Sequence, residues 1–186
     1  GMFARCKMGR GFSLGDKFDT RNVTDFSRMF YNCDMMGDFS LGDNFDTGNA
    51  KTMVSMFSFA YMGDNFTLGE KFDTRKVSDM SGMFKCAFMG LNFKLPDSFD
   101  TENVCDMSDM FNSCVFTKGF KLGRSFKTFN VEDMSFMFEN CAFNDDFSVT
   151  ENFVVSKSCD DSNMFLNAKN KPSVVREQKT FLEDIV

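Results

Sequence analysis

A fixed period of 27 residues runs through most of the chain and limits its possible folds more than any other feature of the sequence. One marker is a Met-Phe pair, which recurs at Met29, Met56, Met83, Met110, Met137 and Met164. A second marker is a Phe-Asp-Thr triplet, which begins at Phe18, Phe45, Phe72 and Phe99. One such unit is too small to bury its own apolar side chains, so neighbouring units must stack. The period therefore predicts a repeat array.

The order of side chains within one unit predicts its local structure. Each unit opens on an apolar-polar-apolar triplet, such as Phe93-Lys94-Leu95, which is typical of a short strand with one buried face. A turn follows, and then a second extended segment containing Phe-Asp-Thr. A serine such as Ser108 precedes most Met-Phe pairs, which predicts an N-cap and a short helix of one or two turns.

The expected fold is therefore an α/β repeat solenoid, a right-handed coil of about six 27-residue units with short parallel strands and short helices. We expect one solenoid over residues 1–168. It comprises a half-repeat at 2–11 and units starting at residues 12, 39, 66, 93, 120 and 147. Gly1 before Met2 resembles an expression-tag scar. Upstream repeats or a leader before this point, and a native start on a half-repeat, both remain open.

The end of the chain departs from the repeat, and residues 169–186 are expected to close the stack. Lys171-Pro172-Ser173 can start a helix, and the apolar residues that follow share one helical stripe. We therefore predict an amphipathic C-terminal capping helix over Ser173–Asp184, with a linker into further sequence as the alternative.

Composition excludes several functions. The net charge of −6 disfavours nucleic acid and anionic membrane surfaces as partners. No apolar run is long enough to span a bilayer. The chain has no histidine, so nucleophilic catalysis would lack its usual base, and zinc would lack a common ligand. We expect no enzyme activity and no cofactor.

The seven cysteines allow two interpretations. Four of them occupy one repeat position, which holds alanine in other units, and this favours a small buried filler. The alternative is a pair of disulfides between adjacent units, Cys6–Cys33 and Cys114–Cys141, since stacked units bring equivalent positions close together. Parallel side chains and the odd number of cysteines disfavour these bridges.

Three further residue types that recur at fixed repeat positions have a structural and a chemical interpretation. The methionines before and within Met-Phe favour core filling over a soft-metal site. The threonine after each Phe-Asp favours local hydrogen bonding over a flat hydroxyl array that orders ice or carbohydrate. Two aspartate positions could bind calcium between units or accept local backbone hydrogen bonds. The first position comprises Asp19, Asp46, Asp73 and Asp100, and the second comprises Asp25, Asp79, Asp106, Asp133 and Asp160.

The segment Val104–Cys114, Val-x-Asp-Met-Ser-x-Met-Phe-x-x-Cys, resembles a repeat of about 26 residues found in bacterial surface proteins and lipoproteins. This repeat is similar to the BspA-like branch of the leucine-rich repeats, whose strand closes in Leu-Pro, as Leu95-Pro96 does here. The resemblance covers about residues 2–168. It implies a leucine-rich-repeat solenoid and, more loosely, a cell-surface or secreted protein that contacts host or neighbouring-cell proteins.

Positions that stacking does not constrain vary between units, and these are the candidates for recognition. The partner-binding candidates are Arg21, Arg75, Lys76, Glu102 and Phe129. The favoured function is a non-enzymatic protein-protein interaction solenoid on the bacterial surface or secreted, with adhesion as one role. The alternative is an intracellular, cytoplasmic scaffold whose thiols stay free in a reducing compartment.

Overall fold

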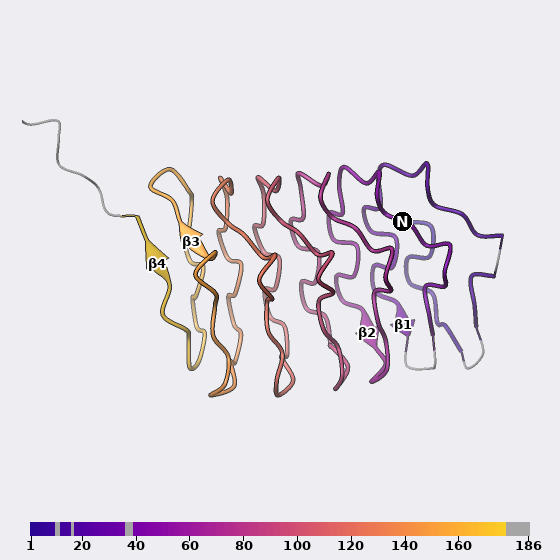
Figure 1. Cartoon of the computed structure of the whole chain (residues 1–186). Coiled ribbons are helices and arrows are strands. Elements are labelled where there is room, and N and C mark those ends of the chain that lie inside the picture. Colours follow the sequence, from indigo (N-terminus) through magenta and orange to yellow (C-terminus); the bar gives the residue numbers. More distant parts are fainter. Residues whose placement is uncertain (10–11, 16, 36–38, 178–186) are drawn as a thin grey trace, which may run out of the picture.

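The computed structural model describes residues 1–9, 12–15, 17–35 and 39–177. The chain winds through successive coils that lie side by side from the N-terminal to the C-terminal end (Figure 1). Neighbouring coils pair in parallel with a shift of 27 residues along most of the stack. One such ladder runs through Asp25, Thr52, Asp79, Asp106, Asp133 and Asp160.

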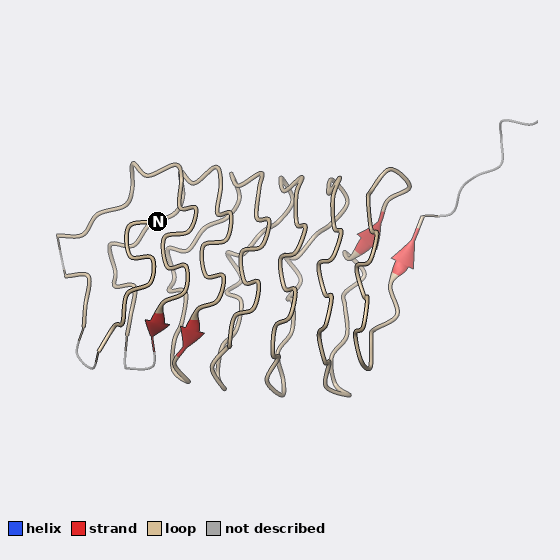
Figure 2. Cartoon of the chain, turned by 180° about the vertical axis from the view of Figure 1, so that it is seen from behind, coloured by secondary structure: helices blue, strands red, loops and turns tan. Residues whose placement is uncertain are grey.

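Among the described residues, four short strands occur, and most of the remaining chain is turn or loop (Figure 2). Strand β1 (Asp34–Met35) pairs with β2 (Tyr61–Met62), with Asp34 opposite Tyr61. Single bridges continue this ladder in both directions, to Lys7 and through Phe88. Strand β3 (Val154–Val155) pairs with β4 (Val175–Arg176) at the C-terminal end of the stack.

The apolar-polar-apolar triplets show the predicted alternation of burial without regular strand pairing. Phe66 and Leu68 are buried, while Thr67 between them is exposed. Among these triplets, within the described ranges, the only bridge joins Ser13 to Ser40. The pattern therefore identified the inward side chains, whereas most ladder pairs formed elsewhere in the unit.

The predicted short helices are wrong for the part of the chain that the structure describes. Within the Met-Phe segments, Met83, Lys85 and Ala87 donate their N–H groups to carbonyls three residues back. The intervening residues donate to the next coil instead: Phe84 N–H bonds to the carbonyl of Met110 at 2.9 Å. Gly82 and Cys86 have φ values of 59° and 55°, so the backbone turns instead of continuing as a helix.

The serine predicted to be an N-cap has a different role. Ser108 N–H bonds to Asp106 Oδ1 at 2.8 Å, so the aspartate closes a local turn and the serine is its donor. Equivalent bonds join Ser27 to Asp25 and Ser81 to Asp79. The same residues that suggested a helix start therefore stabilise the entry into the turns.

The core consists of aromatic ladders that run along the stack. Phe57, Phe84 and Phe111 are fully buried, and their ring centroids are separated by 5.7 and 5.5 Å with nearly parallel planes. A second ladder links Phe72 to Phe99 at 6.3 Å. Fully buried methionines such as Met53, Met80, Met107 and Met134 lie in the same core, as the core-filling interpretation predicts.

The predicted C-terminal capping helix does not begin where the sequence suggested. Val175–Arg176 form β4, in place of the first turn of that helix. The remainder of the predicted helix, at 178–184, lies outside the described residues. Arg176 also forms an ion pair with Asp161, which ties the end of the described chain to the last full coil.

Within the described residues, no helix is long and apolar enough to cross a membrane.

Candidate functional site

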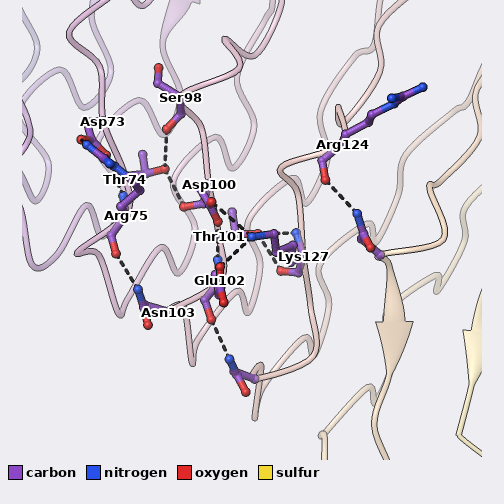
Figure 3. A network of polar contacts seen from close by, with 12 residues as sticks. Asp73, Thr74, Arg75, Ser98, Asp100, Thr101, Glu102, Asn103, Arg124 and Lys127 are labelled. Carbon is purple, nitrogen blue, oxygen red and sulfur yellow. Dashed lines mark hydrogen bonds and ion pairs between the residues drawn. The ribbon is translucent and has the colours of Figure 1, made fainter.

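One edge of the stack is formed by equivalent four-residue segments of successive coils, each with threonine at its second position and most with aspartate before it. We call residues 19–22, 46–49, 73–76, 100–103 and 127–130 the Asp-Thr edge. Its frame is built from buried threonines. Thr47 Oγ1 donates to the carbonyl of Asp73 at 2.8 Å and accepts from the N–H of the same residue at 2.8 Å. The same two-way bond joins Thr101 to Lys127 (Figure 3).

These bonds decide between the two interpretations of the threonines. The edge threonines are almost completely buried, with at most 2% of each residue exposed. A flat surface array of hydroxyl groups is therefore not formed. Instead, each threonine hydroxyl bonds to the backbone of the next coil, a contact that we call a threonine clamp. The clamp lies where the backbone would otherwise have unpaired polar groups.

Asparagine side chains add a second link along the edge. Asn103 Nδ2 donates to the carbonyl of Arg75 at 2.7 Å, and Asn130 Nδ2 donates to that of Glu102 at 2.7 Å. Figure 3 shows this arrangement between neighbouring coils. The backbone of the edge is therefore held from both sides, while the side chains of Arg75 and Glu102 project from it.

The aspartates of the edge are engaged in local hydrogen bonds. Asp19 Oδ1 accepts the N–H of Arg21 at 3.0 Å, and Asp73 Oδ1 accepts that of Arg75 at 2.9 Å. Each carboxylate also binds the guanidinium of the same arginine, with Nη2–Oδ2 distances of 2.6 and 2.5 Å. The hydrogen bonds from Arg21 lower the pKa of Asp19 to about 2, and those from Arg75 lower the pKa of Asp73.

The fourth and fifth coils of the edge carry a different arrangement of charge. Lys127 takes the place of the aspartate, and its Nζ lies 3.3 Å from Asp100 Oδ2 and 2.6 Å from Glu102 Oε2. The hydrogen bond to Glu102 is the main reason that the pKa of Lys127 is raised. The lysine therefore neutralises two carboxylates of the preceding coil.

The structure places all five predicted partner-binding residues on this edge, in four of its coils, and all five are exposed. Four of them already have partners: Arg21 and Arg75 bind aspartates, Glu102 binds Lys127, and Lys76 Nζ donates to Asn49 Oδ1 at 2.8 Å. Phe129 differs, since half of it is exposed. The side chains after each threonine vary from coil to coil, while each threonine hydroxyl bonds to the backbone of the next coil.

Sequence reasoning missed a hollow on the edge at Gly48, where the neighbouring coils carry arginine. It has a volume of about 480 Å³ and is lined by Asp46, Gly48, Asn49, Asp73, Arg75 and Lys76. The signal was present in the repeat as the one glycine in that position. Without the neighbouring coils, however, a glycine in a turn carries no indication that a space surrounds it.

A second exposed feature lies on the ladder that contains β2. The rings of Tyr61 and Phe88 stack with centroids 4.4 Å apart, and Val115 follows them on the same ladder. Each is exposed, by 40%, 38% and 56% respectively. Sequence reasoning did not select these residues, although their position holds lysine and aspartate in earlier coils.

The remaining candidate chemistry has local explanations in the structure. Carboxylates of the second aspartate position accept neighbouring N–H groups, as Asp79 accepts from Ser81 at 2.9 Å. Across the described part of the chain, no group of three or more acidic or thiol side chains is arranged to hold a metal ion. All seven cysteines are free. Cys114 and Cys141 are buried and donate to the carbonyls of Phe84 and Phe111.

Fold and edge together define a repeat-containing protein whose coils share one backbone frame and differ in the side chains they present. Comparison with known families agrees with this description. The family described as "Mycoplasma protein of unknown function, DUF285" matches residues 1–89 and 62–177, and the chain belongs to it. No curated protein and no solved structure matched the chain.

Proposed function

We propose that the protein is a non-enzymatic binding protein that uses the Asp-Thr edge to contact another protein. The observation that carries this proposal is a fixed frame with variable side chains. Threonine side chains bond to the next coil along the edge, and asparagine side chains add bonds in several coils. The residue after each threonine, in contrast, changes from arginine to glycine, glutamate or phenylalanine. Rigid scaffolds that present variable polar and aromatic groups suit protein recognition.

We further propose that the array is a right-handed solenoid of the leucine-rich-repeat type, exposed at the bacterial surface or secreted. The family resemblance and the parallel ladders at 27-residue spacing support this proposal. An adhesin, anchored as a lipoprotein, is the role that the resemblance suggests. An experimental structure giving the hand of the coils tests the fold, and protease treatment of intact cells tests the location.

The alternative is an intracellular scaffold, and the free state of all seven cysteines favours it. The two locations predict different results from the same cells. A surface protein is cleaved by protease added to intact cells, whereas an intracellular one is cleaved only after lysis. The protein is therefore assayed after protease treatment of intact cells and of lysed cells. A cytoplasmic marker that survives only in the intact cells serves as the control.

The binding proposal is tested with edge variants that keep the fold. Phe129→Ser removes the half-exposed ring, and Glu102→Gln removes a charge without removing the Asn130 contact, which uses the Glu102 backbone. The affinity of each purified variant for surface proteins of a host or neighbouring cell is then measured. Phe88→Ser is the matched control, because it removes an exposed ring from the ladder of β2.

We expect the edge variants to lose at least about tenfold in affinity for the bound protein, since exposed aromatic side chains often dominate interfaces. The control variant should bind as the unchanged protein does. Melting temperatures of all variants establish that the fold is kept. Equal binding by Phe129→Ser, Glu102→Gln and the unchanged protein would exclude the Asp-Thr edge as the contact surface.

A further inference from the structure

The repeat itself shows what a carboxylate on the Asp-Thr edge binds. Asp19 and Asp73 occupy equivalent positions two coils apart, and each holds the guanidinium of the arginine two residues later. In both coils the arginine Nε contacts Oδ1 and Oδ2 at 3.0 Å, and Nη2 contacts Oδ2 at 2.6 or 2.5 Å. Such a forked contact is specific for the planar guanidinium group.

The coil between them has the same carboxylate without the arginine. Asp46 Oδ1 accepts the N–H of Gly48 at 2.8 Å, just as the other two aspartates accept the N–H of their arginines, so the carboxylate is oriented in the same way. In the region that the structure describes, no basic side chain forms an ion pair with Asp46. Among the described residues, the only hydrogen bond that the Asp46 carboxylate accepts is the one from the Gly48 N–H.

The missing arginine side chain leaves the hollow at Gly48. A Cβ added to Gly48 would lie 3.1 Å from Asp46 Oδ1 and 4.0 Å from Asp73 Oδ2, so two carboxylates border the space. The hollow, about 480 Å³ in volume, is large enough for a guanidinium group and part of its aliphatic stem. Its opening lies on the exposed edge, so a side chain can enter from outside.

The basic residues around the hollow are already engaged. Arg75 is held by Asp73, and Lys76 Nζ donates to Asn49 Oδ1. Arg21, on the other side, is held by Asp19, although the nearby charge of Asp46 also contributes to raising its pKa. Asp46 is therefore left with a negative charge that its own coil does not neutralise.

We propose that Asp46 and Gly48 form a guanidinium site that accepts an arginine side chain from a protein partner. The inserted group would repeat the contacts that Arg21 and Arg75 make in the adjacent coils. Lysine fits less well, because a single ammonium group cannot form the forked contact. This inference rests on the proposed function and adds to it the chemistry of one contact residue in the partner.

The test uses two short peptides, acetyl-Gly-Arg-Gly-amide and the same peptide with uncharged citrulline in place of arginine. Binding is followed by the NMR shift of the Gly48 backbone amide, which bonds directly to Asp46. Asp46→Asn removes the charge and keeps the acceptor oxygen. Gly48→Arg supplies the missing side chain within the chain. Asp43→Asn is the matched control, because Asp43 is an exposed carboxylate of the same coil.

We expect a saturable shift of the Gly48 amide with the arginine peptide, and affinity at least about tenfold weaker for the citrulline peptide. Asp46→Asn should lower the affinity for the arginine peptide by a similar factor, and Gly48→Arg should abolish binding. Asp43→Asn should leave the affinity unchanged. Melting temperatures confirm that each variant is folded. Absence of a saturable shift, or equal affinity in Asp46→Asn and Asp43→Asn, would overturn the site.

Failure of this site is distinguishable from failure of the proposed function. If edge variants such as Phe129→Ser lose a protein partner while Gly48 shows no arginine binding, only the guanidinium site is wrong. If the arginine peptide binds at Gly48 while the edge variants keep full binding to the partner, the site stands and the assignment of the edge as the protein-binding surface is wrong.

Discussion

At the scale of single residues, the threonines of the Asp-Thr edge show how one hydroxyl group links two coils. Thr47 Oγ1 is both donor and acceptor to the backbone of Asp73, and it is 1% exposed as a residue. Valine has nearly the same shape but cannot form either bond. Its introduction would leave the N–H and C=O of Asp73 without these partners in a water-poor environment.

We therefore predict that Thr47→Val lowers the free energy of unfolding by about 2 kcal/mol, because a buried polar group left unpaired costs about 1–3 kcal/mol. Urea denaturation measures the change. Thr24→Val is the control, since Thr24 is exposed and its side chain forms none of the clamp bonds. Equal stability of the two variants would show that the clamp does not contribute.

The cysteines differ in reactivity because they differ in burial. Cys6 and Cys105 are exposed, whereas Cys33, Cys114 and Cys141 are buried. Burial raises the pKa of Cys141 to about 12 and the pKa of Cys114 well above its ordinary value. Since the thiolate is the reactive form, these two thiols should react very slowly in the folded protein.

A thiol reagent added to the folded protein should therefore modify Cys6 and Cys105 rapidly and leave Cys33, Cys114 and Cys141 unmodified. Mass spectrometry after digestion identifies the modified residues. All seven should react once the protein is unfolded in denaturant without reductant. Fewer than seven reactive thiols in that control would indicate disulfides and contradict the free state of the cysteines.

At the scale of one element, the turns after the aspartates replace the predicted helices. The sequence pattern Asp-x-Ser followed by Met-Phe is compatible with a helix start and with a local turn. The structure forms the turn because every second N–H then reaches a carbonyl of the next coil, as Phe84 reaches Met110. A short isolated helix would leave most of its terminal groups without partners.

The aspartates of these turns and those of the Asp-Thr edge make stability depend on pH. Hydrogen bonds lower the pKa of Asp25, Asp73 and Asp160, and that of Asp19 to about 2. A carboxyl whose pKa is lower in the folded state stabilises the fold fully above its unfolded pKa of about 4, and this contribution is lost as the pH falls through the folded pKa. The melting temperature should therefore fall as the pH is lowered from about 5 to about 2.

Circular dichroism melting curves across this range test the prediction. Asp73→Asn should melt at a lower temperature than the unchanged protein at neutral pH, because the pair with Arg75 is lost, and its melting temperature should vary less with pH. Asp145→Asn, which changes an exposed carboxylate outside these turns, should follow the unchanged protein. A melting temperature that is constant on acidification would contradict the proposed role of the aspartates.

At the scale of the whole molecule, stability comes from ladders in which each coil covers the next. Phe84 stacks between Phe57 and Phe111, and it is completely buried. Near the C-terminal end, Phe165 stacks with Phe138 and is only partly buried. In such an array, each coil adds its own stability and one interface with each neighbour.

Removal of one complete unit should therefore leave a folded protein. Deletion of 93–119 takes out 27 residues and restores every repeat position across the junction. We expect cooperative unfolding in urea with a smaller slope, because less surface is exposed on unfolding, and with lower stability. Deletion of 93–112 is the control: it breaks the register, so the aromatic ladders cannot align. If both deletions unfold alike, the coils are not interchangeable units.

The 27-residue period determined by itself the spacing of the coils and the side chains that face the core. Phe66 and Leu68 are buried because stacked coils cover equivalent positions in every unit. Such positions are therefore apolar in each repeat and can be recognised from the sequence. The same pattern also placed Arg21, Arg75 and Phe129 among the exposed residues, since residues that vary freely between units are not part of the ladders.

Only the tertiary structure decided between helix and turn. The N–H of Phe84 could bond within its own segment or to the carbonyl of Met110, and that carbonyl comes within reach only when the next coil stacks. It also decided which charges pair. Lys127 neutralises Asp100 from the following coil, whereas Asp46 faces the hollow that Gly48 leaves. Such contacts join residues of different coils, and their distances follow from the stacking, which no single unit of the sequence contains.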